Sequence, residues 1–389
     1  MNDSRATRWA AVLFWTVTTL ALLYGLNALA HRLEPMPDTR FDGRAGGQRG
    51  AFTSLRVALF VNGTLGDKSF FDSAAHGVRQ AAASMPVRAR VVEGGTDPTR
   101  WRAALTDLAD SGDYDVVIAG TFTVAPYVEA LAPHYPAIRF IVYDAQVDYA
   151  RCACSNVYSM RFRQNEGAYL AGFMAARLLQ RGLPGVPPGA GAGVVGGMQL
   201  PVIEDFITGF SAGVRAAAPA LALQVQYANA FSDPAAGKEI AKLQFSRGAG
   251  VVFHAAGATG QGVNEAAAQA RRYAIGVDMD QYALYRERDP ARAAAIVTSV
   301  MKQVDVGLVR ALRLTLSGKL AYGQLESIGL AEGGVRLAPY SSVLAALPVR
   351  AATELTAQLD AQRAAIVAGT LVVPSAFDPT SPGPARQQP

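Results

Sequence analysis

Cysteine and histidine are scarce in this sequence, with two and four residues among 389, and this limits the chemistry that the chain can perform. Cys152 and Cys154 are separated by a single residue, and no histidine is near them in the sequence. Two thiols are too few ligands for a metal site. They either form a Cys-x-Cys disulfide in an oxidising compartment or remain two free thiols without a role. No histidine lies in a Gly-x-Ser-x-Gly or His-Glu-x-x-His motif, as a hydrolase would require. We therefore expect no enzyme, no catalytic residues, no metal and no cofactor.

The sequence also lacks a block of charge of one sign. Its 36 Lys and Arg residues nearly balance its 31 Asp and Glu residues, leaving a net charge of +5 with both signs interspersed. No basic stripe with interleaved aromatic residues occurs, so nucleic acid is not expected as a partner.

An apolar run from Trp9 to Ala30 follows Arg5 and Arg8, and it indicates export. At roughly 20 residues the run is long enough to span a bilayer. It also ends in the small-x-small pattern Ala28-Leu29-Ala30 that signal peptidase cleaves. Residues 1–30 are thus either a membrane anchor or a signal peptide. Both place the rest of the chain beyond the inner membrane, anchored at its periplasmic face or soluble in the periplasm.

Composition divides the remainder of the chain into three parts. Residues 31–53 are rich in Gly, Arg, Asp and Pro and are expected to be a linker. Residues 372–389, rich in Pro, Ser and Gln towards the end, are expected to be a disordered tail. The roughly 320 residues between them exceed the usual size of one hydrophobic core, so two lobes are expected.

Short β-rich runs alternate with helical patterns along this central part, which predicts α/β lobes with parallel sheets. The expected strands are 57–61, 87–92, 116–119, 140–143, 193–195, 223–227, 250–254 and 273–277. The expected helices are 73–85, 100–109, 166–179, 203–217, 233–246, 262–271 and 304–317.

The first expected strand ends in the turn Asn62-Gly63-Thr64, and a helix is expected soon afterwards. Parallel α/β sheets bind ligands at the carboxyl ends of their strands, close to helix N-termini. This junction is therefore a candidate ligand site.

Several further motifs follow in a fixed order, and together they resemble the basic membrane protein family (Bmp/PnrA-like), substrate-binding components of ABC-type nucleoside importers. They are Glu166–Gly172, Gly196-Gly197-Met198 with Phe206, Ala256-Gly257, Gly276–Gln281, Ser299–Lys302 and Gly333-Gly334-Val335. The resemblance implies a type I periplasmic-binding-protein fold, with a ligand cleft between two lobes. The implied bounds are 54–160 with 282–322 for lobe 1, and 161–281 with 323–371 for lobe 2.

The resemblance also implies a purine nucleoside as ligand and a membrane permease with a cytoplasmic ATPase as partners. Phe70 and Phe206 align with the family's stacking pair, and aromatic rings suit the flat faces of a base. Asp278 aligns with the ribose-binding Asp, and Asp280 is expected to cap the next helix. Lys302 aligns with a ligand-side Lys that contacts ribose or Asp278. Gly257 lets the ligand approach the backbone.

Two positions depart from the family pattern. Asn62 stands where the family commonly has Asp after the first strand, and no acid follows the third strand, in 120–125. Base reading then falls to Asn62, Thr121 or Thr123. Relatives are usually lipoproteins, but no cysteine precedes Cys152, so a lipid anchor is not expected.

The same residues also fit less specific roles and rival protein classes. If Phe70 and Phe206 do not stack on a ligand, they are core residues on the faces of helices. If Asp278 does not bind ribose, it is a capping residue. The segment 257–262 resembles a dinucleotide-binding turn, without the acidic residue that such a site needs. A DNA-binding regulator of the same fold would begin with a helix-turn-helix instead of an apolar run. A membrane-anchored sensing domain for a nucleoside or related molecule is the main alternative to transport.

Overall fold

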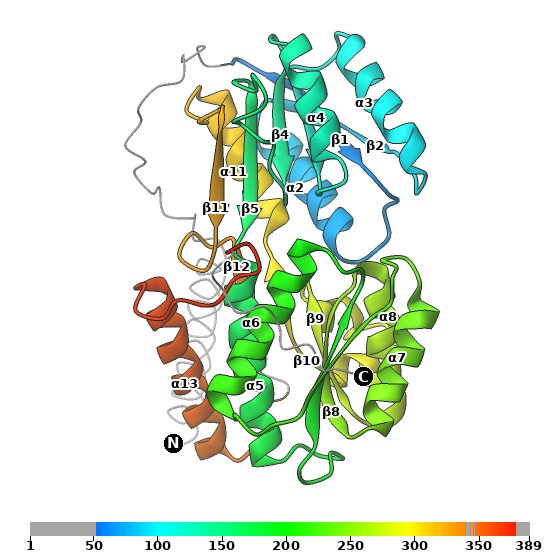
Figure 1. Cartoon of the computed structure of the whole chain (residues 1–389), viewed down its shortest axis with the longest axis vertical. Helices are drawn as coiled ribbons and strands as arrows, with labels where there is room; N and C mark the ends of the chain where they lie inside the picture. The colour runs from blue at the N-terminus through cyan, green and yellow to red at the C-terminus, as the bar shows by residue number, and fades with distance from the viewer. Residues whose placement is uncertain (1–51, 340–342, 344, 346, 379–389) are drawn as a thin grey trace, which may run out of the picture. The chain divides into compact units, whose positions relative to one another are not determined.

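The computed structural model describes residues 52–339, 343, 345 and 347–378. In this part the chain forms two α/β lobes, each built on a six-stranded sheet (Figure 1). The apolar segment Trp9–Ala30 and nearly all of the expected linker lie outside the described residues. Within them, no helix is both long enough and apolar enough to cross a membrane.

The sheet of lobe 1 has the order β11-β5-β4-β3-β1-β2, and all neighbouring strands run parallel. Its strands are β1 (Leu55–Val61), β2 (Val87–Glu93), β3 (Val116–Gly120), β4 (Arg139–Tyr143), β5 (Val157–Phe162) and β11 (Gln324–Ile328). Its helices are α2 (Phe70–Ser84), α3 (Trp101–Asp110), α4 (Ala125–Leu131) and α11 (Val304–Leu316), with 3-10 helices at Pro98–Arg100 and Ala132–His134.

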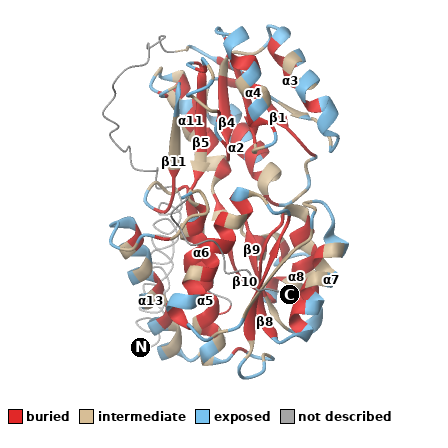
Figure 2. Cartoon of the chain, in the orientation of Figure 1, coloured by how far each residue is buried: buried red, intermediate tan, exposed pale blue. Residues whose placement is uncertain are grey.

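Both faces of this sheet are covered, which explains why β1 is apolar and buried from Val57 to Val61 (Figure 2). Val57 and Leu59 pack into the same core cluster as residues of α2 and α11. Ala58 and Phe60 point the other way and pack with residues of α3 and α4. Successive side chains of a strand alternate between the faces, so a strand buried on both sides needs a continuous apolar run.

The sheet of lobe 2 has the order β12-β10-β9-β8-β6-β7, parallel except for β12, which runs antiparallel to β10. Its strands are β6 (Gly191–Gly196), β7 (Leu223–Tyr227), β8 (Ala249–Ala255), β9 (Tyr273–Val277), β10 (Ile296–Lys302) and β12 (Val335–Leu337). Its helices are α5 (Gln164–Arg181), α6 (Pro201–Ala217), α7 (Pro234–Ser246), α8 (Gly260–Ala270), α9 (Gln281–Tyr285), α10 (Pro290–Ala294) and α13 (Val349–Val367), with a 3-10 helix at Gly257–Thr259.

Helices α5 and α6 pack closely against each other on one face of this sheet, and α7 and α8 cover the other. Glycine makes the close approach of α5 and α6 feasible. A Cβ on Gly172 would lie 2.1 Å from the carbonyl oxygen of Phe210, and one on Gly213 would lie 2.0 Å from that of Tyr169. Larger residues at these two positions would force the helices apart.

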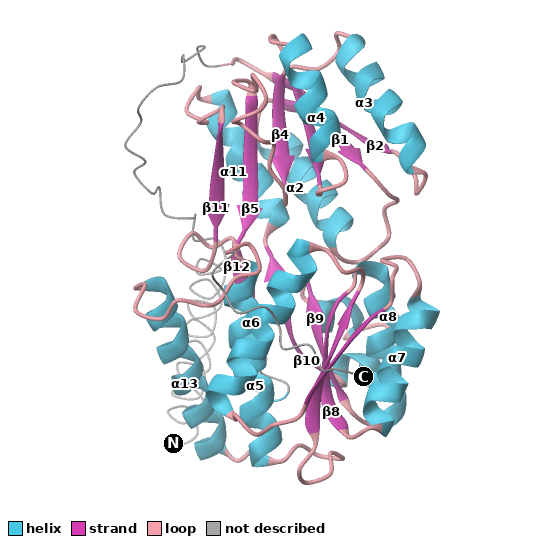
Figure 3. Cartoon of the chain, viewed as in Figure 1, coloured by secondary structure: helices cyan, strands magenta, loops and turns pink. Residues whose placement is uncertain are grey.

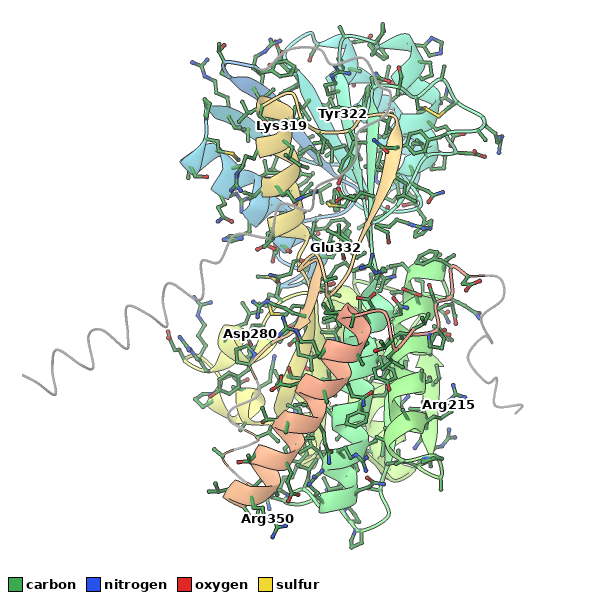
Figure 4. The ribbon with its side chains drawn as sticks, turned by 90° about the vertical axis from the view of Figure 1, so that its left-hand side faces the viewer. Arg215, Asp280, Lys319, Tyr322, Glu332 and Arg350 are labelled. Atoms are coloured by element: carbon green, nitrogen blue, oxygen red, sulfur yellow. A yellow bond between two sulfur atoms is a disulfide. The ribbon has the colours of Figure 1, made fainter. Side chains whose placement is uncertain are left out.

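The chain passes between the sheets three times: from β5 to α5, from β10 to α11, and from β11 to β12. Glu332, labelled in Figure 4, belongs to the third passage, and Arg163 of the first passage donates to its carboxylate. The sheet pairing differs from the expected lobe bounds in two places. Strand β10 lies within 282–322 but pairs with β9 in lobe 2, and β11 lies within 323–371 but pairs with β5 in lobe 1.

The start of the expected tail is ordered, which corrects the prediction for residues 372–378. Figure 3 draws this segment as loop after α13. Val373 is buried, and Asn165 of α5 donates to the carbonyl groups of Val373 and Pro374, both at 3.1 Å. The loop between β4 and β5 contains the Cys152–Cys154 disulfide, one of the two states that the sequence allowed.

Candidate functional site

The candidate residues come together because the strands that carry them run parallel within each sheet and end in short turns. Three of these turns begin with a residue in the left-handed region directly after a strand: Thr121 (φ 77°) after β3, Asp144 (φ 57°) after β4 and Asp278 (φ 64°) after β9. This conformation is uncommon for residues other than glycine, and Asp adopts it more readily than most. Strained backbone of this kind clusters at ligand sites.

Lys302 and Asp144 form an ion pair between the two lobes. The Nζ atom of Lys302 donates to both carboxylate oxygens of Asp144, at 2.8 Å each. Lys302 is 2% exposed and Asp144 is 7% exposed. Burial raises the pKa of Asp144, and the ammonium of Lys302 opposes that rise. Lys302 is the last residue of β10, a strand that is not among those expected from the sequence.

Aromatic rings from both lobes surround the Lys302 ammonium. Its Nζ lies 5.3 Å from the ring centre of Phe70 in lobe 1 and 5.1 Å from that of Phe206 in lobe 2. The ring of Phe162 lies 5.8 Å away. Phe70 stacks on Tyr143 with 5.3 Å between ring centres, and Phe206 is tilted against Phe253 at 6.0 Å. The structure thus brings the two expected stacking residues together from opposite lobes.

Asp278 is buried at 6% exposure and also joins the lobes, because the hydroxyl of Ser69 donates to its Oδ2. Ser69 directly precedes α2 in lobe 1. Burial raises the pKa of Asp278 to about 6, while Lys302 and the Ser69 hydrogen bond act in the opposite direction. The Lys302 ammonium bonds Asp144 and influences Asp278 through its charge, whereas the sequence suggested a direct contact with Asp278 or ribose.

The neighbouring Asp280 has the capping role expected from the sequence. Its Oδ1 accepts from the backbone N–H of Ala283 at 3.0 Å, at the N-terminus of α9. The two aspartates of one motif therefore differ in role, since Asp278 faces the other lobe and Asp280 caps a helix.

A buried polar network supports the turn that contains Asp278. The side chain of Gln281 donates to the carbonyl of Val277 at 3.2 Å and accepts from Asn264. The Oδ1 atom of Asn264 contacts Nε2 of His254 at 3.2 Å. Burial lowers the pKa of His254 to about 4, so this histidine is neutral at physiological pH.

Asn62 is buried after β1 and contacts the loop after β3. Its Nδ2 donates to the hydroxyls of Thr121 at 2.9 Å and Thr123 at 3.2 Å. The two threonine hydroxyls are 2.8 Å apart. Within the part of the chain that the structure describes, the buried Oδ1 of Asn62 has no hydrogen-bond partner, and such atoms are rare in proteins. This amide oxygen is an acceptor available to a donor of a ligand.

Gly257 lies at the same edge of the second sheet, two residues after β8. Its φ of 56° is in the left-handed region, which favours glycine. A Cβ at this position would lie nearest to atoms of Phe231, which is not one of the aromatic residues around Lys302.

Sequence reasoning missed Asp144, Tyr143 and Ser69 as members of this cluster. Asp144 directly follows a strand that the sequence did predict, and a carboxylate at the carboxyl end of a parallel strand is a recognisable signal. Ser69 contacts Asp278 only because the two lobes meet there, and Tyr143 joins the cluster by stacking on Phe70 within lobe 1. No local sequence pattern reveals either contact.

Comparison with known proteins agrees with this architecture. The sequence profile described as "ABC transporter substrate-binding protein PnrA-like" (Bmp) matches residues 54–375. The solute-binding protein of an ABC transporter system from Aeropyrum pernix has the same fold, with a TM-score of 0.68 and 27% identity, over 82% of this chain and 93% of that one. The lobes and parallel sheets are those of type I periplasmic binding proteins.

Two relatives extend the comparison. A CD4+ T-cell-stimulating antigen of Listeria innocua is 27% identical over 86% of this chain and 92% of its own length. The ABC transporter nucleoside-binding protein BmpA of Lactococcus lactis is 31% identical over 59% of this chain and 65% of its own length. Because the profile spans nearly all of the two lobes, the chain belongs to the Bmp family of PnrA-like ABC-transporter substrate-binding proteins.

Proposed function

We propose that this protein binds a nucleoside, most favourably a purine nucleoside, between its two lobes and delivers it unchanged to an ABC permease with a cytoplasmic ATPase. One observation carries the proposal: Phe70 and Phe206, from different lobes, lie around the same ammonium, and the charge of this ammonium acts on the buried carboxylate of Asp278. Two aromatic rings suit the faces of a base, and a carboxylate suits the vicinal hydroxyls of ribose.

The network around Asn62 supports a role in reading the edge of the base. Both donor positions of its amide are directed at Thr121 and Thr123, which leaves Oδ1 as an acceptor. A purine with an N–H on its edge would satisfy this atom, which otherwise costs roughly 1–3 kcal/mol when buried unpaired. Because the side chain of Asn62 is an uncharged amide, a neutral base suffices as its partner.

Calorimetry with the purified protein tests the proposal directly. Purine nucleosides, pyrimidine nucleosides, free bases and free ribose are titrated in turn, and each mixture is then analysed by chromatography. We expect heat from purine nucleosides, weaker binding of bases, and recovery of every ligand unchanged. A protein that binds none of them, or that converts one of them, is not a nucleoside-binding component.

Export and partnership need a second experiment in the cell. We propose that residues 1–30 hold the protein at the periplasmic face of the inner membrane, and mass analysis of the native N-terminus tests this. A mature chain that starts at His31 would show a cleaved signal.

Deletion of the gene tests the partnership with a permease and should abolish nucleoside uptake. Unchanged uptake with altered signalling would support a sensing domain instead.

A further inference from the structure

Residues 371–378 follow the last helix and are bound tightly to lobe 2. The buried carboxylate of Asp205 on α6 accepts from the Ser375 hydroxyl at 2.6 Å and from the Ala376 backbone N–H at 2.9 Å. Asn165 on α5 donates to the carbonyl groups of Val373 and Pro374. Asp205 is fully buried, so these hydrogen bonds are shielded from water and hold the segment in place.

The same segment also contacts lobe 1, through Phe377. Its ring stacks on Phe122, with 5.9 Å between ring centres and 16° between planes. The guanidinium of Arg161 on β5 lies 4.8 Å from the ring centre of Phe377. Phe377 therefore links the lobes by side-chain packing, in addition to the three covalent passages of the chain.

Both anchor points of the segment adjoin candidate ligand residues. Asp205 directly precedes Phe206, and Phe122 lies between Thr121 and Thr123, the two partners of Asn62. A shift of either anchor would move a proposed ligand contact. The segment is thus positioned to sense and to restrain the separation of the lobes at this site.

We propose that residues 371–378 are a strap that holds the loop after β3 against lobe 2 and slows the release of the bound ligand. The effect on ligand rests on the proposed nucleoside binding, whereas the restraint on the lobes does not. Phe377 is a positioning residue in this scheme, because it acts through Phe122 and does not touch the ligand.

Phe377→Ala in the full-length protein tests the strap, with Val372→Ala as a matched control. Val372 belongs to the same segment, but its side chain is 83% exposed. Loss of the aromatic pair should increase the nucleoside dissociation rate about two- to tenfold, the factor that corresponds to the usual worth of such a pair. Stopped-flow displacement of a nucleoside measures this rate, and Val372→Ala should match the wild type.

Hydrogen exchange gives a second readout that needs no ligand. The backbone amides of Val124 and Ala125 donate to the carbonyl of Thr121, and they should exchange faster in Phe377→Ala than in Val372→Ala. Ser375→Ala, which removes a donor to Asp205, should act in the same direction and serves if Phe377→Ala does not fold. Unchanged exchange in both variants would overturn the strap. If the wild type binds no nucleoside, the proposed function fails, and the exchange experiment still decides whether the strap restrains the lobes.

Discussion

Lys302 at the end of β10 donates to both carboxylate oxygens of Asp144 after β4, so one buried ion pair connects the two lobes. The Ser69–Asp278 hydrogen bond forms a second connection nearby. Both link the carboxyl edge of one sheet to that of the other, which is where parallel α/β folds bind ligands. A ligand that enters here must exchange contacts with groups that already hold the lobes together.

The first prediction concerns the stability that depends on this pair. Lys302→Met leaves the carboxylate of Asp144 buried without its cation, and removing one partner of a buried pair typically costs about 3–5 kcal/mol. We expect the free energy of unfolding, measured by urea denaturation of the ligand-free protein, to fall by about that amount. Ligand affinity should fall as well, because the ammonium also acts on Asp278.

A double variant separates lost charge from lost packing. Asp144→Asn removes the carboxylate but keeps a side chain that tolerates the left-handed backbone at this position. Lys302→Met combined with Asp144→Asn should recover most of the lost stability. If the double variant is no more stable than Lys302→Met alone, the unpaired charge is not the cause of the loss.

The second prediction is a pH dependence with opposite signs for folding and for binding. The pKa of Asp278 is about 6 in the folded protein, above the ordinary value of 3.8, so the folded state holds this proton more tightly. Its contribution to stability is complete below about pH 4 and is lost as the pH rises through about 6, an effect on the order of 2–3 kcal/mol. Nucleoside affinity should instead fall as the pH drops through about 6, because the ionised carboxylate accepts from the ribose hydroxyls.

Urea denaturation and calorimetry between about pH 4 and pH 8 check both signs, with Asp278→Asn as the reference. Burial raises the pKa of Asp205 to about 6 as well. Because Asp205 is present in both proteins, its contribution cancels when the pH profile of Asp278→Asn is subtracted from that of the wild type. The groups that act on Asp278 are Lys302, Ser69, Asp67 and Asp144. Identical pH profiles for the wild type and Asp278→Asn would contradict a raised pKa at this residue.

The sequence predicted the local elements better than the connections between them. Each expected strand and helix overlaps an observed one, because continuous apolar runs and helical spacing are local signals. Strands β10, β11 and β12 were not recognised, and the expected bounds placed β10 and β11 in the wrong lobes. Strand β10 ends in Lys302, and its place in the sheet follows from its pairing with β9 and from the ion pair to Asp144, which are not local signals. Strand β11 is only partly buried, so its sequence has no continuous apolar run.

The candidate site shows the same division. Phe70, Phe206 and Lys302 were found through the motifs and do lie together, as was Asp278, on which the charge of Lys302 acts. The hydrogen-bond partners of Asp278 and Lys302, however, come from the other lobe. Asp144 was overlooked as the partner of Lys302, 158 residues away in sequence. The strap was mistaken for disorder because its composition is that of a tail, and its order depends on Asp205 and Phe122, which no local pattern connects to it.

The third prediction concerns the aromatic residues. Phe70→Ala and Phe206→Ala should each weaken binding by roughly 1–3 kcal/mol for nucleosides and for free bases alike, since stacking involves the base alone. Phe210→Leu is the control: its ring is buried and stacks on Phe253, so it should reduce stability with little change in affinity. Calorimetry on all three variants decides, and equal affinity losses in Phe206→Ala and Phe210→Leu would make Phe206 a core residue only.

The last prediction separates the sugar from the base. If Asp278 accepts from both ribose hydroxyls, Asp278→Ala should weaken nucleoside binding by about 2–5 kcal/mol, the cost of truncating one side of a buried charge-assisted contact. Binding of the free base should change far less, because the base does not reach this carboxylate. Asp280→Asn is the matched control, since an asparagine two residues away still caps α9 and leaves Asp278 in place.

Calorimetric titration of a nucleoside and its free base into both variants gives four affinities to set against those of the wild type. The expected pattern is a large loss in one of them, that of the nucleoside with Asp278→Ala. Equal losses for nucleoside and base in that variant would mean that Asp278 does not hold the sugar. Its bond to Ser69 would then serve only to join the lobes, and the ribose contact would have to come from another group near Lys302.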